Sequence, residues 1–65
     1  MTEMRRRRLN MWLSVQDLAD LSGLSPASIW SYERGDRWPR LDHAMIVAAN
    51  LGCHVEDLFN TRGAR

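Results

Sequence analysis

The chain of 65 residues contains no lysine, a single cysteine and no long apolar run. One cysteine excludes an intramolecular disulfide, and a lone thiol is typical of a reducing, intracellular compartment. No apolar run approaches the roughly 20 residues that cross a membrane. The arginines near the N-terminus are not followed by the apolar segment of a signal peptide. These absences predict a cytoplasmic protein with no membrane partner.

The sequence is also too short for more than one domain. A chain of this length buries only roughly 60% of the surface that it exposes when unfolded, so a compact packing of helices is the simplest stable arrangement. We predict one domain over residues 1–60. The last residues, TRGAR at 61–65, are small or polar and are predicted to form a short flexible tail.

Positive charge is carried by arginine alone, and its distribution says more than its total. The net charge is only +1, which does not by itself indicate a nucleic-acid partner. The arginines cluster at Arg5–Arg8 and again at Arg34, Arg37 and Arg40, and such clusters set the field that a phosphate meets. Because consecutive helical residues point in different directions, Arg5–Arg7 form either a solvated surface or an arm that reaches DNA.

Apolar spacing and capping residues predict two helices in the first third of the chain. A helix over about 3–11 places Met4, Arg8 and Met11 on one face. Ser14 and Asp17 form a capping-box pattern that begins the next helix. The residues of this second helix predicted to share one face are Leu18, Leu21 and Ser22, with Ala19 beside them.

Three further helices follow. Gly23 is expected to end the second helix in the left-handed conformation, and Ser25 and Pro26 begin a third that Gly35 ends. A loop over 36–40 leads to a fourth helix, 41–51, and a last turn spans 55–59. No stretch alternates with a period of two, so the predicted fold class is all-α with five helices. The predicted apolar stripe of the fourth helix is Leu41, Ala44, Met45, Ala48 and Leu51.

A helix, a tight glycine turn and a capped second helix make the plan of a helix-turn-helix. Ala19 is small enough for a close helix crossing, and Leu24 and Ile29 would fill the space between the helices. The stretch LSVQDLADLSGLSPASIWSYERGDRWPRLDHAMIVAANLGCHVEDLF resembles the Cro and lambda-repressor (XRE-type) family, over Arg8 to about Phe59. The matching marks are Leu13-Ser14, Leu18-Ala19, Gly23-Leu24-Ser25, Ile29, Tyr32-Glu33-Arg34-Gly35, Pro39, Ala48-Ala49-Asn50-Leu51-Gly52 and Val55-Glu56-Asp57-Leu58-Phe59.

The resemblance implies a compact five-helix, lambda-repressor-like domain that binds double-stranded DNA. It implies a bacterial or phage-encoded transcriptional regulator, often a repressor, that binds a palindromic operator as a homodimer and is nucleoid-associated when bound. The recognition helix of such proteins enters the major groove, and here it corresponds to Ser25–Arg34. The base-reading positions carried over by the resemblance are Pro26, Ala27, Ser28 and Ser31.

These positions depart from the long polar side chains that the family often has there. Ala27 can contact a thymine methyl, and Ser28 and Ser31 can hydrogen-bond to donors or acceptors. None forms a bidentate pair with a base, each of which is worth about 1–3 kcal/mol of discrimination. Sequence preference would then also depend on Arg37 or Arg40, on water, or on DNA shape.

Phosphate contacts are expected at the start of the second helix and in the loop after the recognition helix. The former would use free N–H groups and the positive end of the helix dipole. The expected phosphate-contacting residues are Ser14, Val15, Gln16, Arg34, Arg37 and Arg40. The resemblance also implies a partly buried, structural ion pair between Arg8 and Glu33.

Three tryptophans are many for so short a chain. Trp12 stands where the family commonly has glycine, and because tryptophan tolerates a left-handed backbone badly, we expect a different turn there. Trp30 would pack on the fourth helix, meet a sugar-phosphate edge or join a protein interface. Trp38 would cover the loop, and a dimer interface would use the last helix, the tail or exposed apolar groups such as Trp30 and Phe59.

No cofactor, metal site or catalytic centre is predicted. Cys53, His43 and His54 lack the paired spacing of a zinc site, and Cys53 is expected to be a buried thiol. His54 occupies the cap position of the last helix. A histidine side chain caps a helix poorly, which costs about 1 kcal/mol of stability. The alternative function is a protein-interaction module, antitoxin-like or polymerase-contacting, whose exposed tryptophans and methionines bind a protein partner.

Overall fold

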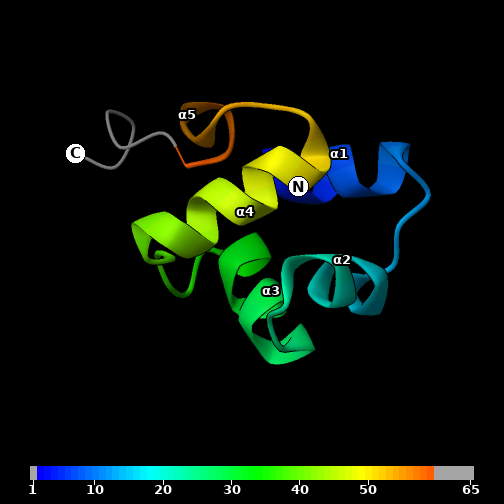
Figure 1. The fold of residues 1–65 in the computed structure, drawn as a ribbon, viewed down its shortest axis with the longest axis horizontal. Helices are drawn as coiled ribbons and strands as arrows, with labels where there is room; N and C mark the ends of the chain where they lie inside the picture. Colours follow the sequence, from blue (N-terminus) through cyan, green and yellow to red (C-terminus); the bar gives the residue numbers. More distant parts are fainter. Residues whose placement is uncertain (1, 60–65) are drawn as a thin grey trace.

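The computed structural model describes residues 2–59, and these form five helices without a strand among them (Figure 1). The predicted all-α fold with five helices is therefore confirmed. The predicted tail, 61–65, lies outside the described residues. The helices are α1 (Glu3–Asn10), α2 (Val15–Ser22), α3 (Pro26–Arg34), α4 (Leu41–Leu51) and α5 (Val55–Leu58).

Hydroxyl side chains begin the first three helices. Thr2 Oγ1 accepts from Arg5 N–H at 3.2 Å, and Ser25 Oγ accepts from Ser28 N–H at 3.1 Å. At α2 the capping box is complete: Ser14 Oγ accepts from Asp17 N–H at 2.9 Å, and Asp17 Oδ2 accepts from Ser14 N–H at 3.0 Å. Each such cap contributes about 1 kcal/mol, so these local signals fix where the helices start.

The start of α5 uses an aspartate in place of a hydroxyl cap. Asp57 Oδ2 accepts from His54 N–H at 2.9 Å, which is one half of a capping box. The imidazole of His54 is exposed. The carboxylate therefore compensates in part for the missing serine or threonine.

Left-handed residues end the first four helices, and one of them is not glycine. Gly23, Gly35 and Gly52 have φ of 69°, 79° and 69°, as predicted. Trp12 has φ of 60°, and its turn closes with Trp12 N–H to Leu9 O at 3.0 Å and Leu13 N–H to Arg8 O at 3.2 Å. This is the same Schellman pattern that follows the glycines.

The expectation that tryptophan would change this turn is therefore wrong. The two turn hydrogen bonds hold the left-handed backbone at Trp12 although a side chain there costs roughly 1–2 kcal/mol. The indole does not offset this cost by packing, because 92% of Trp12 is exposed.

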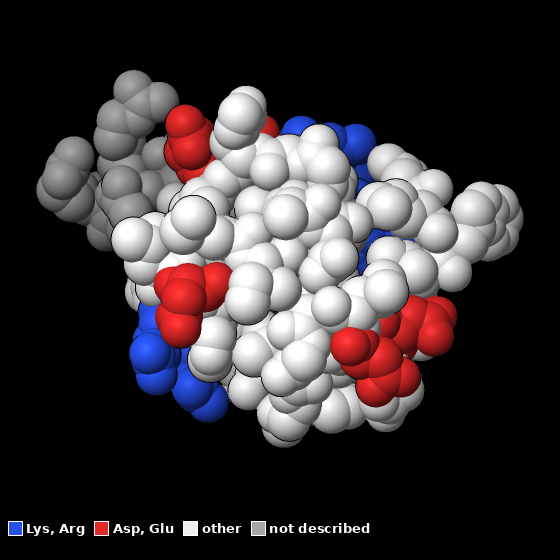
Figure 2. All heavy atoms as spheres, viewed as in Figure 1, with Lys and Arg blue, Asp and Glu red and all other residues white. Residues whose placement is uncertain are grey.

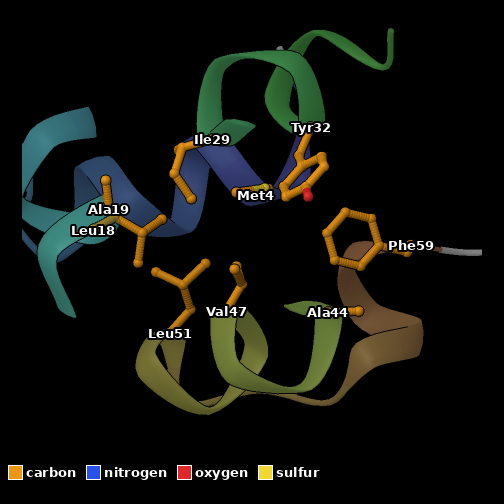
Figure 3. Close-up of a cluster of buried hydrophobic side chains, with 9 residues drawn as sticks. All are labelled: Met4, Leu18, Ala19, Ile29, Tyr32, Ala44, Val47, Leu51 and Phe59. Atoms are coloured by element: carbon orange, nitrogen blue, oxygen red, sulfur yellow. The ribbon is translucent and has the colours of Figure 1, made fainter. Parts of the chain in front are cut away.

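One core joins all five helices (Figure 3). Met4 of α1 lies in its middle, between Ile29 and Tyr32 of α3 on one side and Val47 of α4 on the other. Leu13, Val15, Leu24, Cys53, Val55 and Leu58 pack around it and are partly buried. The buried core side chains are Met4, Leu18, Ala19, Ile29, Tyr32, Ala44, Val47, Leu51 and Phe59.

Four apolar residues that the periodicity assigned to inward faces are exposed. Leu41 and Met45 are 70% and 56% exposed because the buried stripe of α4 runs through Ala44, Val47, Ala48 and Leu51, about an eighth of a turn away from the predicted one. Leu21 is 58% exposed, since α2 buries Leu18, Ala19 and Ser22. Met11 is 46% exposed because α1 ends before it.

The α3–α4 loop and the last turn close the core at one end. Phe59 is buried and meets the Tyr32 ring edge-on, with 6.5 Å between the ring centroids. The Trp38 ring lies beside Phe59, with 6.1 Å between the ring centroids, and Trp38 is 56% exposed. Phe59 is consequently not the exposed interface residue that the sequence suggested.

The strained turn makes a direct prediction about stability. Trp12→Gly should raise the free energy of unfolding by about 1 kcal/mol, because glycine relieves the left-handed strain and loses no packing, while its greater freedom when unfolded offsets part of the gain. Urea denaturation measures the change. Trp12→Ala, which keeps a Cβ, is the matched control and should gain less than half as much; a Trp12→Gly protein no more stable than Trp12→Ala would contradict the assignment of strain.

Candidate nucleic-acid interface

The α2–α3 pair presents one flank of α3 to solvent. Ala19 is fully buried at the crossing of the two helices, as is Ile29 from α3, and Leu24 of the connecting turn packs partly against them. The inward side of α3 is Ile29, Tyr32 and Glu33. The opposite side of a 3.6-residue helix is therefore the line Ala27, Ser31 and Arg34.

Only two of the four expected base-reading residues lie on this outward line. Ala27 is exposed and Ser31 half-buried on the outward side. Pro26 and Ser28 are both half-buried and, by helical rotation, lie on opposite flanks of α3. The Ser25 hydroxyl donates to Ser28 Oγ at 3.0 Å, so Ser28 is partly engaged in the cap. Small side chains make this surface flat.

The N-terminus of α2 offers backbone donors more than side chains. The first N–H groups of a helix, here those of Val15 and Gln16, have no intrahelical partner. The Ser14 hydroxyl is used by the capping box, and the Gln16 amide donates to Asp20 Oδ1 at 2.8 Å. Hydrogen bonds from the Ser14 backbone and then its side chain lower the pKa of Asp17, so a carboxylate also stands at this end of α2.

The three arginines after α3 are exposed and loosely held. Arg34 Nη2 lies 3.1 Å from Asp36 Oδ2, and Arg40 Nε lies 3.3 Å from Asp42 Oδ1. The Arg37 guanidinium lies 5.9 Å from the centre of the Tyr32 ring. Exposed ion pairs are worth only about 0–1 kcal/mol, so these guanidinium groups can exchange carboxylates for phosphates. Figure 2 shows basic atoms gathered at the edge of the molecule beside the start of α4.

The predicted ion pair between Arg8 and Glu33 is present and buried. Arg8 Nε lies 2.6 Å from Glu33 Oε2, and Nη2 lies 3.1 Å from Oε1. The third hydrogen bond of the guanidinium goes from Nη1 to Leu13 O at 2.8 Å. Arg8 and Glu33 are only 6% and 7% exposed. One side chain of α1 thus holds both the turn before α2 and the last turn of α3.

Trp30 does not pack into the core. It is 55% exposed and lines an open cleft between the start of α1, the start of α2 and α3, together with Arg5, Val15 and Arg34. Sequence reasoning had left Arg5 and Trp30 undecided. The signal that singles out Arg5 is the i+3 and i+4 spacing of Arg6 and Arg7 from Glu3, because both pair with that carboxylate.

The remaining candidates form no site among residues 2–59. No three His, Cys, Asp or Glu side chains of this part of the chain are placed to hold a metal ion. Cys53 is half-buried at the core edge, and burial raises the pKa of its thiol. None of the described helices is both long and apolar enough to cross a bilayer.

Comparison with known proteins agrees with this geometry. A family model described as helix-turn-helix matches residues 4–58, which include all of α2 to α5 and α1 from its second residue onward. No curated protein matches the chain.

The buried pair predicts a large effect on stability. Arg8→Met should lower the free energy of unfolding by about 3–5 kcal/mol, because it leaves Glu33 buried without a partner. Chemical denaturation measures the loss, and Arg6→Ala, at an exposed arginine two positions away, should cost less than about 1 kcal/mol. Removing both charges in Arg8→Met/Glu33→Leu should restore part of the loss. An Arg8→Met protein as stable as Arg6→Ala would show that the pair does not hold the helices.

Proposed function

Since the chain belongs to the Cro/lambda-repressor-like (XRE-type) family of helix-turn-helix DNA-binding regulators, we propose that it is a sequence-selective repressor. It binds a palindromic operator and acts by occupying it. The observation that carries the proposal is the division of α3: Ile29 and Tyr32 are buried in the core, while Ala27 and Ser31 lie on the opposite, open side. That side enters the major groove.

Base recognition in this proposal is direct but modest. The Ala27 methyl contacts a thymine methyl, and the Ser31 hydroxyl bonds to a base edge. Pro26 and Ser28, on the two flanks, contact the bases beside them. Because no side chain there forms a bidentate pair, the deformability of the operator and ordered water supply part of the preference.

Affinity in this proposal comes from the phosphates. The α2 N-terminus, with Ser14, Val15 and Gln16, binds one phosphate through its N–H groups and dipole. The exposed guanidinium groups of Arg34, Arg37 and Arg40 neutralise others along the backbone and release counterions. The Asp17 carboxylate at the same helix end limits the strength of the first contact.

Symmetry follows from the operator. In a homodimer the two α3 helices would stand about 34 Å apart, one turn of DNA, so that each meets one half-site. Each half-site then contributes its own small discrimination, and the spacing between half-sites adds to the selectivity of the whole.

A second candidate function is favoured by the broad area without charged side chains at the centre of the face in Figure 2, which carboxylates border. Large apolar side chains are exposed on α2 and α4, and Trp12 is almost fully exposed. Such a surface can bind a protein partner, as in an antitoxin-like or polymerase-contacting module. The exposed apolar side chains on these elements are Leu21, Leu41, Met45 and Ile46.

The test of the function is the selection of bound duplexes from a random pool at two salt concentrations. We expect a palindromic consensus sequence. We also expect the logarithm of the binding constant to fall linearly with the logarithm of the salt concentration, because each neutralised phosphate contributes about −0.9 to that slope. Recovery of no preferred duplex, with binding indifferent to salt, would support the protein-interaction module.

Removing a phosphate contact and removing a base contact should have different effects on DNA binding. Arg34→Ala should lower affinity on all duplexes alike, because a phosphate contact carries no sequence information. Ser31→Ala should instead change the ranking of half-site variants while leaving the salt slope unaltered. Binding isotherms on the selected operator and on a scrambled duplex separate these effects, and the reverse assignment of effects would overturn the roles given to both residues.

A further inference from the structure

The cleft that Trp30 lines lies beside the proposed recognition surface and shares Val15 and Arg34 with the proposed phosphate contacts, whereas Arg5 and Trp30 have no part in them. It has a volume of about 630 Å³, against about 30 Å³ for a water molecule in the liquid. We call it the Arg5 cleft; its lining includes Arg5 of α1, Val15 of α2, and Trp30 and Arg34 of α3.

The Arg5 cleft has one positive charge that no carboxylate of residues 2–59 balances. Its inner wall holds Arg8 and Glu33, which neutralise each other. Its rim holds Arg34, paired with Asp36. Arg5 is exposed and forms no ion pair with any described residue, so an anion entering the cleft meets an available guanidinium.

The neighbours of Arg5 on α1 are engaged elsewhere. Arg6 Nε donates to Glu3 Oε1 at 3.0 Å, and Arg7 Nε donates to Glu3 Oε2 at 2.8 Å. Of the three arginines whose role the sequence left open, only Arg5 therefore lines the cleft and lacks a carboxylate partner among residues 2–59.

The position of the cleft beside α3 indicates which anion it would bind. A helix is about 10–12 Å across and the major groove is about 12 Å wide, so both flanks of an inserted helix face a sugar-phosphate strand. Trp30 lies on the flank toward the cleft, Arg34 lies between that flank and the outward line, and Ser28 lies on the other flank. Trp30 adds an exposed indole, which is an apolar surface for a sugar.

We propose that the Arg5 cleft receives a phosphodiester of one DNA strand bordering the major groove. Arg5 binds the phosphate, the Trp30 indole packs on the adjoining sugar, and Arg34 exchanges Asp36 for the neighbouring phosphate. The inference rests on the proposed function and adds to it two contacting residues, Arg5 of α1 and Trp30 on the flank of α3 that faces the cleft.

The first test compares Arg5→Ala with Arg6→Ala on the selected operator across a salt series. Arg5→Ala should weaken binding roughly tenfold, since a charge-assisted hydrogen bond is lost, and should reduce the salt slope by about 0.9, one phosphate contact. Arg6→Ala should stay within about twofold of the wild type with an unchanged slope. Circular dichroism establishes that both variants keep the helical fold.

The second test observes Trp30 directly. In Trp12→Phe/Trp38→Phe, Trp30 is the only tryptophan, and saturating operator should at least halve its quenching by acrylamide. Unchanged quenching while the operator is bound would overturn the inference, and so would protection that develops with protein concentration in the absence of DNA.

The outcomes separate the two proposals. If the wild-type protein shows salt-dependent binding to none of the duplexes, both the proposed function and the proposed role of the cleft are refuted. A wild-type protein that binds with a steep salt slope, while Arg5→Ala and Arg6→Ala behave alike, refutes the cleft and leaves the function standing.

Discussion

The placement of α3 depends on one buried contact, the guanidinium of Arg8 held by the carboxylate of Glu33. The Arg8 guanidinium donates two buried hydrogen bonds to Glu33 and a third, partly buried, to the carbonyl of Leu13. A buried ion pair adds little net stability compared with apolar packing, but it penalises arrangements that leave either charge alone. It therefore fixes the angle at which α3 leaves the core, and with it the direction in which Ala27 and Ser31 point.

The core and the interface share the same short helix, and this shapes what the protein can recognise. Three of the nine residues of α3 are buried, so only a narrow outward line remains for bases, and that line is built from small side chains. No side chain on that line can form a bidentate pair with a base. Arginines lie around the line, on the α3–α4 loop and in the Arg5 cleft. In the proposed function, phosphates on both strands position the helix and the small side chains admit it deeply into the groove.

Local signals in the sequence were sufficient for the fold. Ser14, Ser25 and Pro26 start helices by backbone chemistry, and Gly23 and Gly35 end them, so neighbouring residues alone determine these features. Predictions that depended on distant packing were weaker. Leu21, Leu41 and Met45 fit an amphipathic period yet are exposed, because the crossing of α2 with α4 selects the buried stripe. Trp12 keeps a glycine-type turn because the hydrogen bonds around Leu13 outweigh its local strain. The Arg5 cleft combines three helices, and spacing alone could not assemble it.

The central claim is that the outward line of α3 meets DNA while the apolar face of α4 does not. The most direct measurement is a titration of isotopically labelled protein with the selected operator, in which the chemical shifts of the backbone amides are monitored by NMR. The account predicts the largest shifts at Ala27 and Ser31 and at the first residues of α2, with little change at Met45 and Ile46. Large shifts confined to α4, with α3 unaffected, would contradict it.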